Sequence, residues 1–212
     1  MYNKRKVMHI VLIRHGQTAG NLEKRYVGRT DEPILPEAAV SLAKRRESIL
    51  REECEQAVFL FSSPMKRCVQ TAELLCPTLA PHLLEDFREC DFGRFEYKNY
   101  RELAGDADYQ KWIDSMGTRS FPGGESREEF SLRCCNAFRK AIQTGLREHA
   151  EHLFFVVHGG TIMSILEKWA VPKRSYYDWQ CGNGCGFSAD LYLTGPEDPE
   201  PDFCLEITSN FT

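Results

Sequence analysis

Two arginines and two histidines stand at, or a few residues after, the ends of apolar runs that lie far apart in the chain. They are Arg14, His15, Arg67 and His158. Arginine presents planar, paired donors that match phosphate oxygens, and a neutral imidazole can attack an electrophile or carry a proton. If the fold brings these four side chains together, they form a pocket for a tetrahedral dianion.

Three apolar runs precede these side chains, and each predicts a buried strand. The runs span residues 7–13, 57–61 and 153–157. In open parallel sheets, ligands bind beyond the carboxyl ends of the strands, so the polar residues after each run are expected to converge on one crevice. Helices expected to begin at Ser63 and Gly159 would add backbone N–H groups to that crevice.

Capping signals and apolar spacing predict helices between the strands. The predicted helices cover residues 36–53, 64–75, 125–149 and 159–170. Ser63 is the expected N-cap of the second helix, with Pro64 as its first residue. Ser126 and Glu129 have capping-box spacing at the start of the longest helix. The remaining predictions are a loop at 14–35, short strands at 83–85, 186–193 and 203–209, one or two helices within 99–116, and a hairpin loop at 195–201.

Strands that alternate with helices predict an α/β fold. We expect a three-layer α/β/α sandwich with a mostly parallel central sheet, formed by residues 1–212 as a single domain. Residues 87–122 interrupt the alternation and predict a small helical cap inserted beside the sheet.

Composition excludes several classes of protein. The chain has 212 residues, 42% of them hydrophobic, and a net charge of −4, which gives no basic excess for broad nucleic-acid binding. The apolar run near the N-terminus is too short for a signal peptide or a membrane span. Nine cysteines, an odd number, predict free thiols in a reducing cytoplasm. We therefore expect a cytoplasmic protein without nucleic-acid or membrane partners.

Six blocks of sequence follow one another between residues 8 and 161. They are Arg14-His15-Gly16-Gln17-Thr18 with Asn21, Tyr26-x-Gly28-x-x-Asp31, Ser62-Ser63-Pro64 through Arg67 and Thr71-Ala72, Glu89 with Asp91-Phe92-Gly93 and Glu96, Pro122-Gly123-Gly124-Glu125-Ser126, and Val157-His158-Gly159-Gly160. In type and order, these blocks resemble those of the histidine phosphatase superfamily, also called phosphoglycerate-mutase-like proteins. One block alone is a weak signal, whereas six in order are specific.

The resemblance implies a catalytic mechanism. His15 is the implied nucleophile, which forms a phosphohistidine while a backbone carbonyl near Gly16 holds its tautomer. Glu89 is the implied acid, which protonates the leaving oxygen and later takes a proton from water. His158 is the third catalytic residue and stabilises charge on the phosphoryl group. The implied phosphate-binding groups are Arg14, Asn21, Arg67 and the backbone N–H of Gly159, and no metal or cofactor is implied.

Other interpretations of single residues stay open at this point. Glu85, Asp86 and Asp91 are alternatives to Glu89, since the segment could be a solvated acidic face. Arg14 could be a salt-bridge partner. Residues 181–185, Cys-Gly-Asn-Gly-Cys, could suggest a metal loop, but no second Cys/His pair completes it, and a plain glycine-rich loop is favoured.

The chain departs from the family pattern at two places. Ala38 stands where the family often has glycine, and Phe95-Glu96-Tyr97 replaces W-E-G. Neither position supplies a catalytic group, so we expect a change in the mouth of the site rather than a loss of activity.

The expected activity is hydrolysis of a small phosphate ester. Mutases of the superfamily resemble this chain but have a longer insertion with more basic residues than Arg101, Lys111 and Arg119 provide. The cap aromatics could stack on a ring or merely pack the cap. The segments around the acid and P-G-G-E-S look most like the α-ribazole-5′-phosphate phosphatase group of cobalamin biosynthesis. A cofactor-dependent phosphoglycerate mutase, a non-catalytic phosphate-binding module and a homodimer remain open alternatives.

Overall fold

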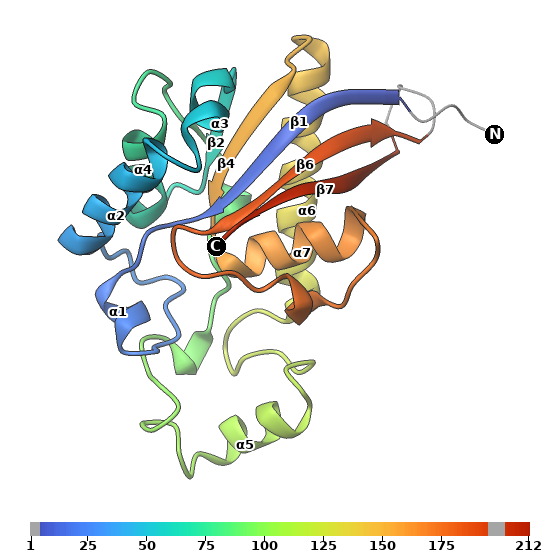
Figure 1. Cartoon of the computed structure of the whole chain (residues 1–212). Helices are drawn as coiled ribbons and strands as arrows, with labels where there is room; N and C mark the ends of the chain where they lie inside the picture. The colour runs from blue at the N-terminus through green and yellow to red at the C-terminus, as the bar shows by residue number, and fades with distance from the viewer. Residues whose placement is uncertain (1–4, 195–201) are drawn as a thin grey trace.

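A seven-stranded sheet forms the centre of the computed structural model, which describes residues 5–194 and 202–212 (Figure 1). The hairpin loop predicted at 195–201 lies outside the described residues. The strands are β1 (Arg5–Arg14), β2 (Phe59–Ser62), β3 (His82–Leu83), β4 (His152–Val157), β5 (Ala170–Val171), β6 (Gly186–Leu193) and β7 (Phe203–Phe211). Their order across the sheet is β3-β2-β4-β1-β6-β7-β5.

Most neighbouring strands run parallel, as predicted. β1 pairs with β4, β2 pairs with β3 and β4, and β5 pairs with β7 in parallel, whereas β6 runs antiparallel to both β1 and β7. The register pairs Arg14 with Val157, so β1 and β4 end side by side. That register places His15 next to His158, the residues that follow the two strand ends.

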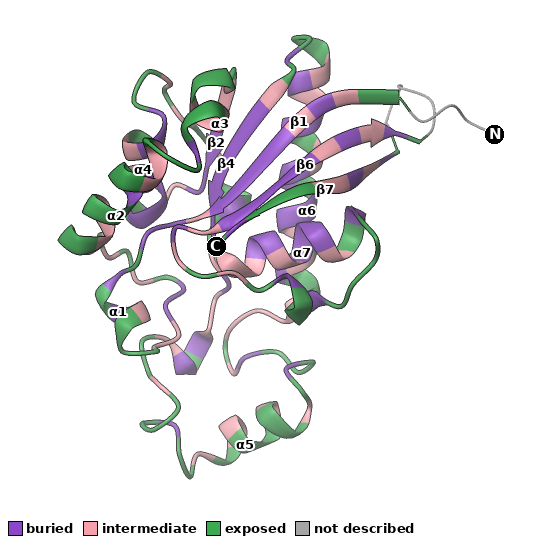
Figure 2. Ribbon diagram, in the orientation of Figure 1, coloured by how far each residue is buried: buried purple, intermediate pink, exposed green. Residues whose placement is uncertain are grey.

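Helices cover both faces of the sheet, which confirms the α/β sandwich. Alternate residues of β1 belong to different cores: Ile13 packs in the cluster with α2 (Pro36–Arg46) and α4 (Lys66–Leu75), and Leu12 in the cluster with α6 (Arg127–Arg147) and α7 (Gly159–Trp169). Figure 2 shows the middle of the sheet buried between these layers. No helix among the described residues is long and apolar enough to cross a membrane.

The helix predicted over residues 36–53 is two helices. α2 ends at Arg46 and α3 spans Arg51–Gln56. The Ser48 hydroxyl donates to the Lys44 carbonyl (2.7 Å), which competes with the helical ladder, and the turn buries Leu50 completely. The prediction missed this because burial of one leucine outweighed local helix propensity.

The predicted N-cap Ser63 does not cap its helix. α4 begins at Lys66, with Met65 in extended conformation at the cap position. The Lys66 N–H donates to Asp31 Oδ1 (2.7 Å), so a carboxylate from a distant loop takes the capping role. Ser63 is thereby free to contact the functional site.

The segment from 87 to 122 lies beyond the carboxyl ends of the strands, together with α1 (Ala19–Leu22), a short helix within the predicted loop (Figure 1). It contains the 3₁₀ turn η2 (Gly93–Phe95) and one helix, α5 (Ala107–Asp114); the 3₁₀ turn η1 (Glu85–Phe87) leads into it. Aromatic rings form its core, with Tyr26 from the loop after β1 contacting Phe92, Trp112 and Phe121. The cap therefore holds a third, smaller apolar cluster, in addition to the two on the faces of the sheet.

Candidate active site

His15 follows β1 and is almost fully buried, with 3% of its surface exposed. Its Nδ1 lies 2.8 Å from the Gly16 carbonyl oxygen, which selects the tautomer protonated at Nδ1 and leaves the Nε2 lone pair free. Gly16 is held in turn because its N–H donates to Thr71 Oγ1 (2.9 Å). Burial, reinforced by the charges of Arg67 and Arg14, holds the pKa of His15 well below its ordinary value, so the ring is neutral.

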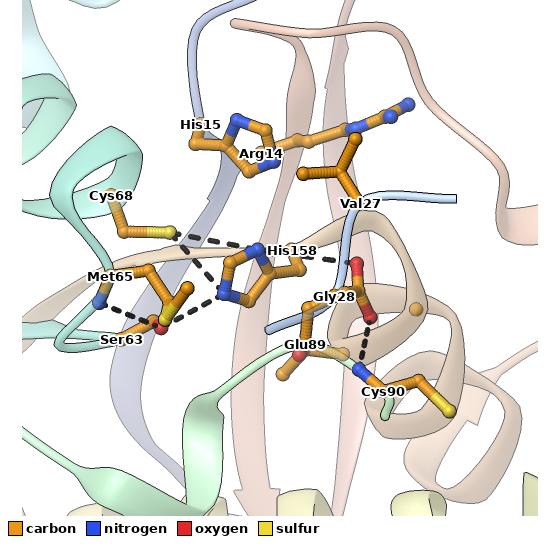
Figure 3. A network of polar contacts seen from close by, with 12 residues as sticks. Arg14, His15, Val27, Gly28, Ser63, Met65, Cys68, Glu89, Cys90 and His158 are labelled. Carbon is orange, nitrogen blue, oxygen red and sulfur yellow. Dashed lines mark hydrogen bonds and ion pairs between the residues drawn. The ribbon is translucent and has the colours of Figure 1, made fainter. Parts of the chain in front are cut away.

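His158 directly follows β4 and occupies the N-cap position of α7. Its ring is completely buried and lies edge-on to His15, with 5.2 Å between the centroids. His158 Nε2 lies 2.8 Å from Ser63 Oγ, the serine freed from capping (Figure 3). Burial, followed by the charge of Arg67, lowers the pKa of His158 well below its ordinary value as well. Two neutral imidazoles therefore face each other in one site.

Arg67 is 1% exposed and is held by backbone carbonyls. It donates to the carbonyls of Thr30 (2.9 Å), Gly28 (3.2 Å) and Val27 (3.3 Å), while its Nε is buried without a partner. Those neutral acceptors leave the charge of Arg67 uncompensated. Its guanidinium is thus available to an anion.

The loop that holds Arg67 is itself held by Glu96. The Glu96 carboxylate accepts from the N–H groups of Gly28 (3.0 Å) and Thr30 (2.9 Å) and from the Thr30 hydroxyl (2.8 Å). Gly28 cannot be larger, because a Cβ there would lie 2.1 Å from the Cys90 carbonyl oxygen. Glu96 belongs to the Phe95-Glu96-Tyr97 segment, which differs from the family pattern. It therefore positions Arg67 indirectly, through the loop that contains Gly28 and Thr30.

Arg14 lies against the first residue of α7. Its Nη1 donates to the Cys181 carbonyl (2.7 Å), its Nε is buried without a partner, and a Cβ on Gly159 would lie 3.4 Å from that Nε. No carboxylate forms an ion pair with Arg14 among residues 5–194 and 202–212. The salt-bridge interpretation of Arg14 is therefore not supported.

Glu89 faces the histidines from the cap side. Its Oε2 lies 4.0 Å from His158 Nδ1, and its Oε1 accepts from the Cys90 N–H (2.9 Å) (Figure 3). Burial raises the pKa of Glu89, although Arg67 and Arg14 partly oppose the shift. Of the alternative acids, exposed Glu85 pairs with Arg88 and Asp91 accepts from Gly93.

Residues 181–185 form a clamp on the segment that carries His15. The Gly184 N–H lies 3.0 Å from the Arg14 carbonyl and 3.1 Å from the His15 carbonyl. Asn183 Nδ2 donates to the His15 carbonyl (3.1 Å) and to Asn21 Oδ1 (3.0 Å). Because its oxygen is engaged, Asn21 can turn only its amide N–H groups to a ligand.

A cavity of about 360 Å³ opens beside these groups. Arg14, Glu89, Gly159 and Gly160 belong to its lining, and we call these four residues the phosphate end. Aromatic rings make up much of the remaining lining: Tyr26, Phe92, Trp112, Phe121, Phe130, Tyr176 and Tyr177. The sequence left open whether the cap aromatics only pack the cap or can also stack on a ring of the substrate. In the structure they pack on one another and also line the cavity.

Comparison with known proteins decides the family. The model of the histidine phosphatase superfamily (branch 1) matches residues 10–195. The chain belongs to the histidine phosphatase superfamily. It is 30% identical over 165 residues to 2,3-bisphosphoglycerate-dependent phosphoglycerate mutase 2 of Gloeobacter violaceus (74% of this chain, 73% of the relative), and 25% identical over 189 residues to adenosylcobalamin/alpha-ribazole phosphatase of Salmonella typhimurium (87% and 91%).

The fold of this histidine phosphatase is similar to that of solved relatives. The alpha-ribazole phosphatase of Shigella flexneri superposes with a TM-score of 0.74 at 23% identity, covering 86% of this chain and 90% of the other. The superfamily match and the similarity to the Salmonella typhimurium phosphatase identify the protein as a phosphatase enzyme.

The histidine phosphatase site brings most of the predicted side chains together. His15, His158, Arg14, Arg67 and Glu89 surround one crevice, and Asn21 is tied to His15 through Asn183. Sequence reasoning missed Ser63 as a partner of His158, as well as the clamp residue Asn183 and the wall residues Arg127 and Tyr176. Among the described residues, no group of three His, Cys, Asp or Glu side chains could hold a metal ion, and this includes Cys181 and Cys185.

Proposed function

We propose that the protein is a metal-independent phosphomonoesterase that works through a phosphohistidine on His15. The observation that carries the proposal is a neutral His15, fixed by the Gly16 carbonyl and flanked by Arg14 and Arg67, with Glu89 opposite. The two guanidinium groups balance the charge of a phosphoryl dianion, so side chains alone can hold it.

In the first step, His15 Nε2 forms a bond to phosphorus as the bond to the leaving oxygen breaks. The Gly16 carbonyl stabilises the positive charge that develops on the imidazole, because it accepts from Nδ1–H. Protonated Glu89 transfers its proton to the leaving oxygen. Arg14, Arg67, His158, Asn21 and the Gly159 N–H bind the remaining phosphoryl oxygens, whose charge grows in the transition state.

In the second step, water attacks the phosphohistidine. Glu89, now a carboxylate, takes a proton from that water as the new P–O bond forms and the P–N bond breaks. The products are inorganic phosphate, neutral His15 and protonated Glu89, which restores the starting state.

The mechanism is tested by trapping the intermediate. We expect wild-type protein to hydrolyse 4-nitrophenyl phosphate without added metal, and rapid quenching with labelled substrate to give an acid-labile, alkali-stable phosphoprotein. His15→Ala removes the nucleophile, so both signals should fall at least roughly 10³-fold. Equal rates for the variant and the wild type would exclude the phosphohistidine, and inactivity of folded wild-type protein toward every ester would favour the non-catalytic module.

For the substrate, we propose an ester whose leaving group contains an aromatic ring, with α-ribazole-5′-phosphate as the first named candidate. The aromatic cavity walls and the similarity to an adenosylcobalamin/alpha-ribazole phosphatase support this choice. A panel with α-ribazole-5′-phosphate, 3-phosphoglycerate and sugar phosphates tests it. Conversion of 3-phosphoglycerate to 2-phosphoglycerate without free phosphate would favour the mutase, which the 30% identical relative also suggests.

We also propose a cytoplasmic location. All nine cysteines are free, and five of them are buried. Unpaired thiols in this number fit a reducing compartment.

A further inference from the structure

Arg127 stands in the wall of the substrate cavity without an acidic partner. It is the first residue of α6, and its guanidinium carbon lies 5.3 Å from the centroid of the Tyr176 ring. Among the described residues, no carboxylate pairs with it. Arg25, another arginine of the cavity lining, is bound by Glu23 and Glu102 at 2.6 Å each. Arg127 therefore adds an uncompensated positive charge to the cavity wall.

The surface under Arg127 is rigid. Tyr176 is 7% exposed, its hydroxyl donates to the Gly160 carbonyl (3.4 Å), and its N–H donates to Glu167 (3.1 Å). Because the ring is anchored to α7, it presents Arg127 at a fixed place relative to the phosphate end. A cation held over an aromatic face keeps its N–H edge free for a ligand.

Helix stability does not explain the arginine. The first turn of a helix favours acidic residues, and α6 has Glu128 and Glu129 there. Ser126 and Glu129 already complete the capping box at this end. A positive side chain at the first position opposes the helix dipole, so its place is better explained by the cavity that it faces.

The charges of the phosphate end are balanced without Arg127. Arg14 and Arg67 match the two negative charges of a phosphoryl group, both histidines are neutral because their pKa values are lowered, and burial raises the pKa of Glu89 toward its uncharged form. A substrate with a neutral leaving group would leave one positive charge of the cavity unmatched.

Aromatic rings that line the cavity also pack on one another. Trp112 and Phe121 stack at 5.0 Å with an interplanar angle of 29°, and Tyr26 is nearly perpendicular to Trp112. This apolar, aromatic lining favours an aromatic body in the leaving group.

We propose that the substrate is an aromatic phosphate monoester whose leaving group carries an anionic substituent, and that Arg127 binds this substituent. The inference rests on the proposed phosphatase function. It is a rival to α-ribazole-5′-phosphate as the substrate, because the leaving group of that ester has no anionic substituent, and the tests below decide between them. Arg127 is thus a specificity-determining residue, and it takes no part in the chemical steps at His15 and Glu89.

Three matched phenyl phosphates test the proposal. The probes carry a para carboxylate, a para carboxamide or hydrogen, and the first two have nearly the same shape. We expect wild-type protein to favour the carboxylate over the carboxamide by roughly 10-fold in kcat/KM, mainly through KM, and to lose the preference in high salt. Comparison with 3-phosphoglycerate shows whether an aliphatic acid serves equally well.

Arg127→Gln should abolish the carboxylate preference, so that the kcat/KM ratio of the carboxylate probe to the carboxamide probe falls from roughly 10 to about 1. Arg119→Gln is the matched control, because it removes the same charge from an exposed cap position outside the cavity. This control should retain the preference.

The outcomes separate this proposal from the phosphatase proposal. If no probe is hydrolysed, the proposed function itself fails. If all probes are hydrolysed but Arg127→Gln keeps the wild-type ratio, only the role of Arg127 is refuted. A preference for 3-phosphoglycerate over the aromatic acid would also overturn the substrate class. So would a preference for α-ribazole-5′-phosphate, whose leaving group is uncharged, with no effect of Arg127→Gln.

Discussion

At the scale of single residues, burial favours the protonation states that the proposed mechanism needs, a neutral His15 and a protonated Glu89. With ordinary pKa values of 6.5 for histidine and 4.5 for glutamate, at most about 1% of molecules would combine a neutral nucleophile with a protonated acid. The lowered pKa of His15 and the raised pKa of Glu89 both enlarge that fraction. Burial in the same crevice therefore shifts both pKa values in the direction that catalysis needs.

Glu89→Gln should separate the contribution of the acid Glu89 to the pH profile from that of the nucleophile His15. For wild-type protein we expect kcat/KM to fall as pH rises through the raised pKa of Glu89, since the acid is then lost, and to fall at low pH as His15 gains a proton. The variant should lose the alkaline limb. Its kcat/KM, which reports the transfer to His15 and not the later attack of water, should drop by roughly 10²- to 10³-fold for alkyl phosphates, and much less for 4-nitrophenyl phosphate, whose leaving group needs no acid.

Glu85→Gln is the control for that measurement, because Glu85 is an exposed acid four residues away that pairs with Arg88. An alkaline limb that survives in Glu89→Gln, or an equal loss for both leaving groups, would show that another residue is the acid.

At the scale of elements, loops distant in the chain hold the site. The 27–30 loop holds Arg67, Glu96 holds that loop, and residues 181–185 clamp the turn after β1. Each bond joins groups that are dozens of residues apart in the sequence. Backbone carbonyls and amides thus position charges without neutralising them, which a carboxylate partner would do.

Asn183→Ala should weaken phosphate binding more than it weakens the fold. Loss of the amide frees Asn21 to rotate, so we expect the inhibition constant of inorganic phosphate to rise roughly 5- to 20-fold, as for the loss of one or two hydrogen bonds. Asn210→Ala, at an exposed position of β7, is the matched control. A lowered melting temperature with unchanged phosphate inhibition would show that Asn183 is structural only.

The sequence predicted the parts of the site that depend on local motifs. Arg14 ends β1, and His15 and His158 directly follow β1 and β4. Apolar patterning locates such strand ends well. Ser63 was assigned wrongly because capping rules consider only neighbours, whereas Asp31 reached the helix from another loop. Asn183 and Arg127 could not be predicted. Asn183 lies in a glycine-rich loop and Arg127 begins a helix, and neither local pattern indicates which distant residues the side chain contacts in the fold.

At the scale of the whole molecule, the two ends of the sheet have different electrostatics. At the end away from the site, His9 lies between Asp190 (2.7 Å) and Glu53 (3.1 Å), joining the sheet to α3. Hydrogen bonds and charges from these carboxylates raise the pKa of His9, although burial opposes the shift. The buried His15 and His158 shift in the opposite direction.

His9→Gln tests this contrast through stability. Because the folded protein holds the His9 proton more tightly, the stabilisation is complete below the unfolded pKa of 6.5 and is lost as pH rises through the folded pKa. In urea unfolding, the wild type should exceed the variant by about 1 to 3 kcal/mol near pH 6, and the difference should shrink at alkaline pH. His149→Asn, at an exposed position, should show no such trend; a difference that grows with pH would refute the assignment.

The position of β1 also has a consequence for synthesis. β1 is made well before both its neighbours: β4 begins about 140 residues after β1 ends, and β6 later still. At typical ribosomal speeds of 5 to 20 residues per second, this apolar strand waits roughly 7 to 30 s for its first partner. The clamp at residues 181–185 is made after β4, so the nascent chain can complete its catalytic crevice only once that segment has also been synthesised. Until β4 and β6 are made, both edges of β1 lack their partner strands, and chaperones or other chains can bind there.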